Sequence, residues 1–361
     1  MVLTPESQPK VLSIMPTFRC TAACQNCGTF SSPGPGHSSL EGHTVTRLIA
    51  QAADAGYRGV VFTGGEATLA LDIVLSGVAQ ANSLGMGTRL VTNGWWAETE
   101  AGAYDILGRL RSAGLDELNL STGDQHARFV PVSSVIRAAV TSLELGFRSL
   151  CVMIEVIEGS VIHKDDILED GEFRMALDKN PAANVQVIES PWMPVRPDRR
   201  NFYPDGYLLN RNNVALKTGC SSCLTTTTVQ ADGRIAACCG IGMRAVPELQ
   251  VGRVESTSLR EADLTAADDF LKRWIRLEGP EKILAWAANI DPEIEWENMY
   301  AHKCQACLRL YKDDRVRAVI QEHHQEKIPD VLLGEFLLTR FEPPAANAEF
   351  LEEIPIGETA P

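Results

Sequence analysis

Several features are missing from this sequence, and each absence narrows its class. No apolar run reaches about eighteen residues, so we expect no membrane span. The first sixteen residues lack the charged-then-apolar pattern of a signal peptide. Basic residues are outnumbered, 33 against 47, and the net charge of −14 argues against a nucleic-acid partner. A hydrophobic content of 45% excludes a wholly disordered chain, and 361 residues suffice for about two domains.

Cysteine, by contrast, is abundant. The chain has ten cysteines, and we expect a cytoplasmic location because no export signal is apparent. In that compartment thiols bind metals more often than they pair as disulfides.

Glycines divide the first half of the chain into units of similar length. Gly56, Gly85, Gly114 and Gly146 follow amphipathic stretches at steps of 29, 29 and 32 residues, the length of a βα unit. We expect strands over 10–15, 59–63, 88–92, 117–121, 149–156 and 185–189, and a further helix over 165–177. Six strands alternating with helices predict a parallel α/β sheet, either doubly wound or curled into a partial barrel, with its chemistry at the carboxyl ends of the strands.

The alternation of strand and helix patterns ends near residue 210, where a second, smaller unit is expected. A β-hairpin is predicted around Asp232-Gly233, and helical patterns return over 283–288 and 316–339. The expected organisation is a tail over 1–9, a barrel over 10–209, a cysteine-rich module over 210–310, a helical extension over 311–340 and an acidic, proline-containing tail over 341–361.

Two short motifs lie at the expected carboxyl edge of the sheet. Cys20, Cys24 and Cys27 follow the first strand in a C-x3-C-x2-C spacing. Three thiolates can hold an iron–sulfur cubane and leave one iron open, whereas a zinc knuckle is the plainer alternative. Gly64-Gly65-Glu66 ends the second strand, where glycines let a backbone approach a ligand and a carboxylate can accept from an ammonium group.

Together these motifs resemble the radical S-adenosylmethionine (SAM) superfamily over about residues 10–200. The resemblance implies a partial (β/α)6 barrel and a [4Fe–4S] cluster on Cys20, Cys24 and Cys27. It further assigns SAM binding to Gly64, Gly65, Glu66, Thr92, Asn93 and Ser121. Two positions depart from the family pattern: Asn26 replaces a common aromatic residue, and Ala67 replaces a frequent proline.

The resemblance also implies a mechanism. SAM would chelate the open iron through its amino and carboxylate groups, and an electron from the reduced cluster would cleave it to a 5′-deoxyadenosyl radical. That radical abstracts a hydrogen atom from an unactivated C–H bond, while the protein positions the target. An external reductant such as flavodoxin or ferredoxin would supply the electron.

A second set of cysteines resembles the SPASM module in its shortened Twitch form. The segment from Thr226 to Cys238 looks like its hairpin, and Cys304 and Cys307 match its later pair. The resemblance implies one auxiliary [4Fe–4S] cluster on Cys220, Cys238, Cys304 and Cys307. Cys223 is an alternative to Cys220, Cys239 is surplus, and a structural zinc is the competing interpretation of the set.

Three further features have two interpretations each. Cys151 is more typical of a small core residue than of a hydrogen donor. His126 is either a surface histidine or a substrate contact at the barrel mouth. The Trp95-Trp96 pair either packs a helix or borders the pocket.

The resemblance leaves the substrate open between two enzyme classes. In the first, a ribosomally made peptide is crosslinked, converted to a thioether or epimerised, with the auxiliary cluster accepting an electron. In the second, a small alcohol, sugar or aminocyclitol is dehydrogenated. Only nineteen residues precede Cys20, so leader recognition would need a separate protein. A zinc-stapled binding protein without turnover is the non-enzymatic alternative.

Overall fold

The computed structural model describes residues 9–195 and 201–341. Its first half repeats a strand and a following helix, as predicted. The strands are β1 (Val11–Ile14), β2 (Gly59–Phe62), β3 (Gly87–Thr92), β4 (Glu117–Gly123), β5 (Ser149–Val156) and β6 (Asn184–Pro191). The helices are α1 (Gly42–Asp54), α2 (Leu71–Ser83), α3 (Glu100–Ala113), α4 (Val132–Glu144), α5 (Lys164–Leu168) and α6 (Gly171–Lys179).

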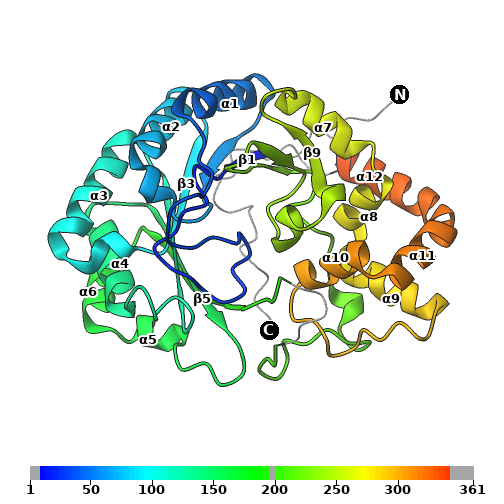
Figure 1. The fold of residues 1–361 in the computed structure, drawn as a ribbon. Helices are drawn as coiled ribbons and strands as arrows, with labels where there is room; N and C mark the ends of the chain where they lie inside the picture. Colours follow the sequence, from blue (N-terminus) through cyan, green and yellow to red (C-terminus); the bar gives the residue numbers. More distant parts are fainter. Residues whose placement is uncertain (1–8, 196–200, 342–361) are drawn as a thin grey trace.

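Strands β1 to β6 pair in parallel and in chain order, which confirms the predicted parallel sheet of a partial barrel. Helices α1 to α6 follow the outer side of this curved sheet (Figure 1). Alternation along each strand sends apolar side chains such as Leu90, Leu118 and Val152 into the fully buried core. The intervening residues, among them Arg89 and Glu117, line the opposite, concave face.

The prediction of one helix over 165–177 is wrong, because two helices, α5 and α6, occupy this segment. Asp170 lies between α5 and α6, and its carboxylate accepts hydrogen bonds from the backbone N–H groups of Glu172 and Phe173. A side-chain cap of this kind starts a new helix, so the amphipathic pattern continues while the helix does not.

The second half contains the predicted hairpin and a group of helices. The strands are β7 (Thr226–Val229), β8 (Arg234–Ala236) and β9 (Gln250–Arg253). The helices are α7 (Leu259–Ala267), α8 (Phe270–Glu278), α9 (Pro280–Ile290), α10 (Lys303–Lys312), α11 (Asp314–His323) and α12 (Ile328–Phe341). Gly233 takes the hairpin turn at φ +83°, where a side chain would be strained. None of the helices in the described ranges has the length and apolarity that a membrane crossing requires.

The hairpin extends the barrel sheet. Strand β7 pairs in parallel with β1, so that Val11 lies opposite Thr226, and β8 and β9 continue antiparallel to give one nine-stranded sheet. The expected limit between the barrel and the cysteine-rich module, at residues 209 and 210, therefore separates strands that belong to one continuous sheet. The tails expected over 1–9 and 341–361 fall, apart from residues 9 and 341, outside the described residues.

Tyr57 joins the two halves at this sheet. Its hydroxyl lies 2.8 Å from both Thr227 Oγ1 on β7 and Asp263 Oδ1 on α7, and Lys10 Nζ lies 2.7 Å from Asp263 Oδ2. Substituting Tyr57→Phe removes the hydroxyl that joins Thr227 to Asp263, and these two residues keep only their mutual hydrogen bond of 3.0 Å and the Lys10 contact. We expect the free energy of unfolding, measured by urea denaturation, to fall by about 1–3 kcal/mol. The exposed control Tyr104→Phe should change it by less than about 0.5 kcal/mol; equal effects would contradict this role of Tyr57.

Candidate functional site

The three N-terminal cysteines lie in a folded loop between β1 and α1. Short bridges join Thr17 to Ser39 and Arg19 to Ser32, and the N–H of Cys20 donates to the carbonyl of Ser32 at 3.1 Å. The loop crosses the open side of the curved sheet, as the dark blue segment of Figure 1 shows. Its ends are therefore held together while the cysteines between them face the carboxyl ends of the strands.

The environment of these thiols disfavours free thiolates. Burial, reinforced by the neighbouring charges of Glu66 and Cys27, raises the pKa of Cys20 to about 11. Burial and the charges of Cys27 and Glu155 raise the pKa of Cys24 to about 12. The Cys27 charge raises the pKa of both Cys20 and Cys24, so ionising these thiols together requires a compensating positive centre such as a metal cluster.

Gly64 and Gly65 bring the second strand against this loop. The N–H of Gly65 donates to the carbonyl of Thr17 at 3.0 Å, and the N–H of Glu66 donates to that of Arg19 at 2.8 Å. Gly64 has φ +123°, and a Cβ on Gly65 would lie 2.1 Å from the Arg19 carbonyl oxygen. Both positions therefore require glycine, for backbone conformation and for space respectively.

Glu66 is fully buried beside the loop and accepts hydrogen bonds from two sides. Its Oε1 accepts from the N–H and hydroxyl of Thr68, at 3.1 and 2.6 Å, and from the hydroxyl of Thr92 at 2.8 Å. Among the residues that the structure describes, Oε2 accepts a single hydrogen bond, from the N–H of Asn93 at 2.9 Å. Burial raises the pKa of Glu66, and these hydrogen bonds oppose the rise. Oε2 retains lone-pair capacity for a further donor, such as an ammonium group.

The tryptophan pair supports this carboxylate. Trp95 Nε1 donates to Thr68 Oγ1 at 3.0 Å, and Trp96 Nε1 lies 3.3 Å from Thr92 Oγ1. Both indoles therefore hold hydroxyls that in turn bind Glu66. The segment of the pair also packs against α3 and α4, so the tryptophans both pack on helices and contact the hydroxyls around Glu66.

Asn93 connects the frame to the cysteine loop. Its amide Nδ2 lies 3.0 Å from Thr21 Oγ1 and 3.8 Å from Cys20 Sγ. Ser121 lies on β4 opposite Met153 of β5, one strand further along the concave face. The structure therefore brings Gly64, Gly65, Glu66, Thr92 and Asn93 together at the loop, with Ser121 on the adjoining wall.

His126 forms a buried ion pair at the same edge of the sheet. Its Nδ1 lies 2.8 Å from Glu155 Oε2, and its ring meets Trp192 edge-on at a centroid distance of 5.9 Å. Trp192 Nε1 donates to the carbonyl of Gln25 in the cysteine loop at 2.9 Å. His126 is thus a partly buried residue at the barrel mouth, and its Nδ1, which faces Glu155, is buried.

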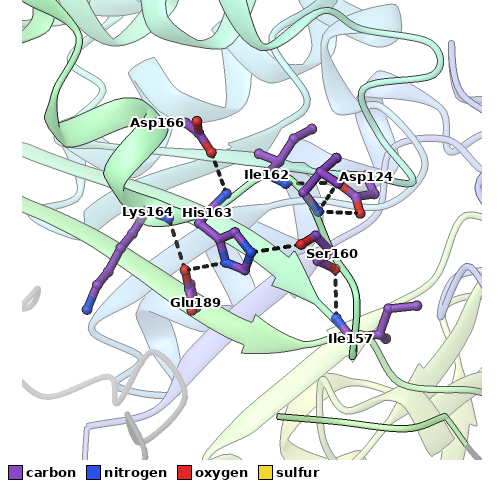
Figure 2. A network of polar contacts seen from close by, with 9 residues as sticks. Asp124, Ile157, Ser160, Ile162, His163, Lys164, Asp166 and Glu189 are labelled. Atoms are coloured by element: carbon purple, nitrogen blue, oxygen red, sulfur yellow. Dashed lines mark hydrogen bonds and ion pairs between the residues drawn. The ribbon is translucent and has the colours of Figure 1, made fainter.

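A polar network fixes the next loop of the mouth, between β5 and α5 (Figure 2). Asp124 accepts from the backbone N–H groups of Val161 and Ile162, at 3.0 and 3.1 Å. The ring of His163 joins Glu189 on β6, 3.1 Å from Nδ1, to the carbonyl of Ser160, 2.8 Å from Nε2. The loop after β5 is therefore tied to the loop after β4 through Asp124 and to strand β6 through Glu189.

The C-terminal cysteines converge from three parts of the chain. Cys238 follows β8, Cys304 and Cys307 lie one turn apart at the start of α10, and Cys220 precedes the hairpin. Burial raises the pKa of Cys238, Cys304 and Cys307, and the charge of Cys220 raises each further. The four predicted ligands therefore lie within electrostatic reach of one another.

The other cysteines have different surroundings. Cys223 is buried, and its Sγ lies 3.5 Å from the carbonyl oxygen of Lys272. Cys239 is exposed. Cys151 is buried on the concave face, and its pKa is raised to about 12 by burial and by Glu117. In the described part of the chain, no three His, Cys, Asp or Glu side chains lie close enough to hold a single metal ion, a geometry that a zinc site requires.

Comparison with known proteins finds a family match in the first half of the chain. Residues 14–124 match the family model of the Radical SAM superfamily. The PqqA peptide cyclase of Xanthomonas euvesicatoria is 33% identical over 111 residues, which are 31% of this chain and 28% of that protein. That of Methylorubrum extorquens is 29% identical over 154 residues, 42% and 38% of the two chains. The matches thus cover well under half the length of these relatives.

Two solved structures share the fold at low sequence identity. Native anSMEcpe with bound AdoMet has a TM-score of 0.51 and 14% identity, covering 91% of this chain and 100% of that one. Streptococcus suis SuiB bound to its precursor peptide SuiA has a TM-score of 0.51 and 18% identity, covering 75% and 67%. The chain therefore shares its partial-barrel fold with these two proteins.

The sequence did not indicate that Glu155 is the partner of His126. Their ion pair should change the pKa of His126, and this effect can be tested. Burial alone lowers the pKa of His126, but the adjacent Glu155 carboxylate raises it above the usual 6.5. In Glu155→Gln, therefore, the midpoint of the His126 ring titration, followed by NMR and assigned with His126→Gln, should fall below 6.5. The wild-type pair stabilises the fold below pH 6.5 and loses this contribution as pH rises through the raised pKa. An unchanged midpoint in Glu155→Gln would contradict the pairing.

Proposed function

We propose that this chain is a radical SAM enzyme that modifies a ribosomally made peptide. The observation that carries the proposal is the backbone pairing of the Gly64–Glu66 segment with the loop of Cys20, Cys24 and Cys27, within the region that matches the Radical SAM superfamily. When bound, a reduced [4Fe–4S] cluster supplies the electron that cleaves SAM and so generates the hydrogen-abstracting radical.

The residues of the site fit this cofactor pair. Cys20, Cys24 and Cys27 supply three thiolate ligands, and the raised pKa values of Cys20 and Cys24 mean that their protons leave when the cluster binds. Glu66 Oε2 has one protein donor only and can accept the ammonium group of SAM. The Gly64–Gly65 backbone, Thr92, Asn93 and Ser121 are the proposed remaining contacts.

Cys220, Cys238, Cys304 and Cys307 are the proposed ligands of one auxiliary [4Fe–4S] cluster. Cys220 is preferred to Cys223 because the Cys223 thiol is buried against the carbonyl of Lys272. The hydrogen atom removed from the substrate is only one of the two lost in an oxidation, so one electron and one proton must follow. An auxiliary cluster would accept that electron, and an external reductant such as flavodoxin or ferredoxin would supply the first.

The peptide assignment rests on the relatives. The curated relatives that match are named peptide cyclases, and one structural neighbour was solved with its precursor peptide. Crosslinking, thioether formation and epimerisation are all compatible with this class, and leader recognition would be the task of a separate protein.

The first test uses anaerobically reconstituted, reduced full-length protein and SAM. We expect about eight irons per chain with matching sulfide, and formation of 5′-deoxyadenosine. Cys24→Ser should lose the first cluster and reduce 5′-deoxyadenosine formation at least about a hundredfold. Wild-type protein that binds zinc in place of iron, or full SAM cleavage by Cys24→Ser, would contradict the proposal.

Neighbouring cysteines provide the matched test of the auxiliary site. Cys238→Ser should lower the iron content to about four while SAM cleavage persists, whereas Cys239→Ser should leave the iron content unchanged. With a precursor peptide, wild-type protein should yield a product lacking two hydrogen atoms, which Cys238→Ser fails to make. A product of unchanged composition carrying deuterium from solvent would identify an epimerase, and oxidation of small alcohols alone would overturn the peptide assignment.

A further inference from the structure

Arg244 of the second half holds both sides of the N-terminal cysteine loop. It ends the 3-10 helix η4 (Ile241–Arg244), which follows the cysteines after β8. Its guanidinium lies 3.6 Å from the ring centroid of Phe18, and its Nη1 donates to the carbonyl of Thr29. Phe18 precedes Cys20 and Thr29 follows Cys27, so one side chain contacts the loop on either side of its three cysteines.

The residues before Arg244 extend this contact to the second cysteine group. A Cβ on Gly28 would lie 3.2 Å from Cγ2 of Ile241, so the loop packs directly on η4. At the other end, a Cβ on Gly240 would lie 2.9 Å from Cys304 Sγ. Residues 240–244 therefore touch both cysteine groups.

The charge of Arg244 is available to the loop. Burial lowers its pKa, and the Asp232 carboxylate and the Cys27 thiolate counteract this effect. Arg244 Nε is buried and has no hydrogen-bond partner within the described residues. A buried N–H without an acceptor is uncommon in a folded protein, and Nε thus remains able to donate.

We propose that Arg244 is a positioning residue that holds the cysteine loop in its ligating shape and places a positive charge beside Cys27. The proposal rests on the proposed function, since it concerns the cluster that this loop would bind. It makes the N-terminal site dependent on the second half of the chain. A fixed positive charge favours the reduced, more negative state of a cluster. Arg244 would thus ease reduction as well as assembly.

Two substitutions distinguish the contacts that Arg244 makes with the loop from the effect of its positive charge. Arg244→Gln removes both, whereas Arg244→Lys keeps a cation that lacks the planar, forked guanidinium. Arg317→Gln, on the half-exposed surface of α11, is the matched control. In metal-free protein, we expect chymotryptic cleavage after Phe30 to quicken about tenfold in Arg244→Gln and Arg244→Lys, and not in Arg317→Gln.

The second readout is the cluster itself. After reconstitution, the cluster signal that responds to SAM in electron paramagnetic resonance is followed during a redox titration. Its midpoint potential should become more negative in Arg244→Gln and remain near the wild-type value in Arg244→Lys. Circular dichroism melting shows whether each variant is folded, and Arg244→Lys serves if Arg244→Gln does not fold.

Wild-type cleavage rates and an unshifted midpoint in folded Arg244→Gln would overturn the role of Arg244 and leave the proposed function intact. A wild-type protein that assembles no SAM-responsive cluster would instead overturn the proposed function. The cleavage assay needs no cofactor, so it tests whether Arg244 holds the loop whether or not a cluster assembles.

Discussion

The site depends on the contact of two backbones, at Gly65 and Arg19. Their separation leaves no room for even a methyl group, and two hydrogen bonds hold the segment after β2 against the segment that precedes Cys20. This pairing fixes where the cysteine loop starts and where Glu66 points. Thr92 and Asn93 at the end of β3 then complete the carboxylate's environment. Three consecutive parallel strands therefore contribute to one site because their carboxyl ends share an edge.

The two faces of the sheet differ in polarity. Leu90 and Leu118 pack under the helices, whereas their neighbours Arg89 and Glu117 form a buried ion pair on the concave face, 2.6 Å apart. Burying charges is costly unless they are paired, so a core that served stability alone would favour apolar residues on both faces. The polar concave wall instead suits a cavity that holds polar ligands.

Local patterns predicted the strands, the hairpin and the two cysteine groups, whereas distant contacts were not predictable. Gly233 and the alternation around it indicate a hairpin, but nothing in residues 226–229 indicates parallel pairing with β1, more than two hundred residues away. The break at Asp170 was hidden because the apolar spacing continues through it. Glu155 and Arg244 belong to the same class: each is an ordinary charged residue in its own segment and gains its role from a distant partner.

The spare cysteines illustrate how the fold selects among chemically equal ligands. Cys238 and Cys239 are consecutive, and successive side chains in extended backbone point to opposite sides. Cys238 is accordingly buried toward Cys304 and Cys307 while Cys239 is exposed. The buried thiols have raised pKa values, so without a metal they remain protonated at neutral pH. A cluster bound there would release these protons, and the free energy of ligation would offset the cost of holding Cys238, Cys304 and Cys307 as thiolates in surroundings that disfavour this form.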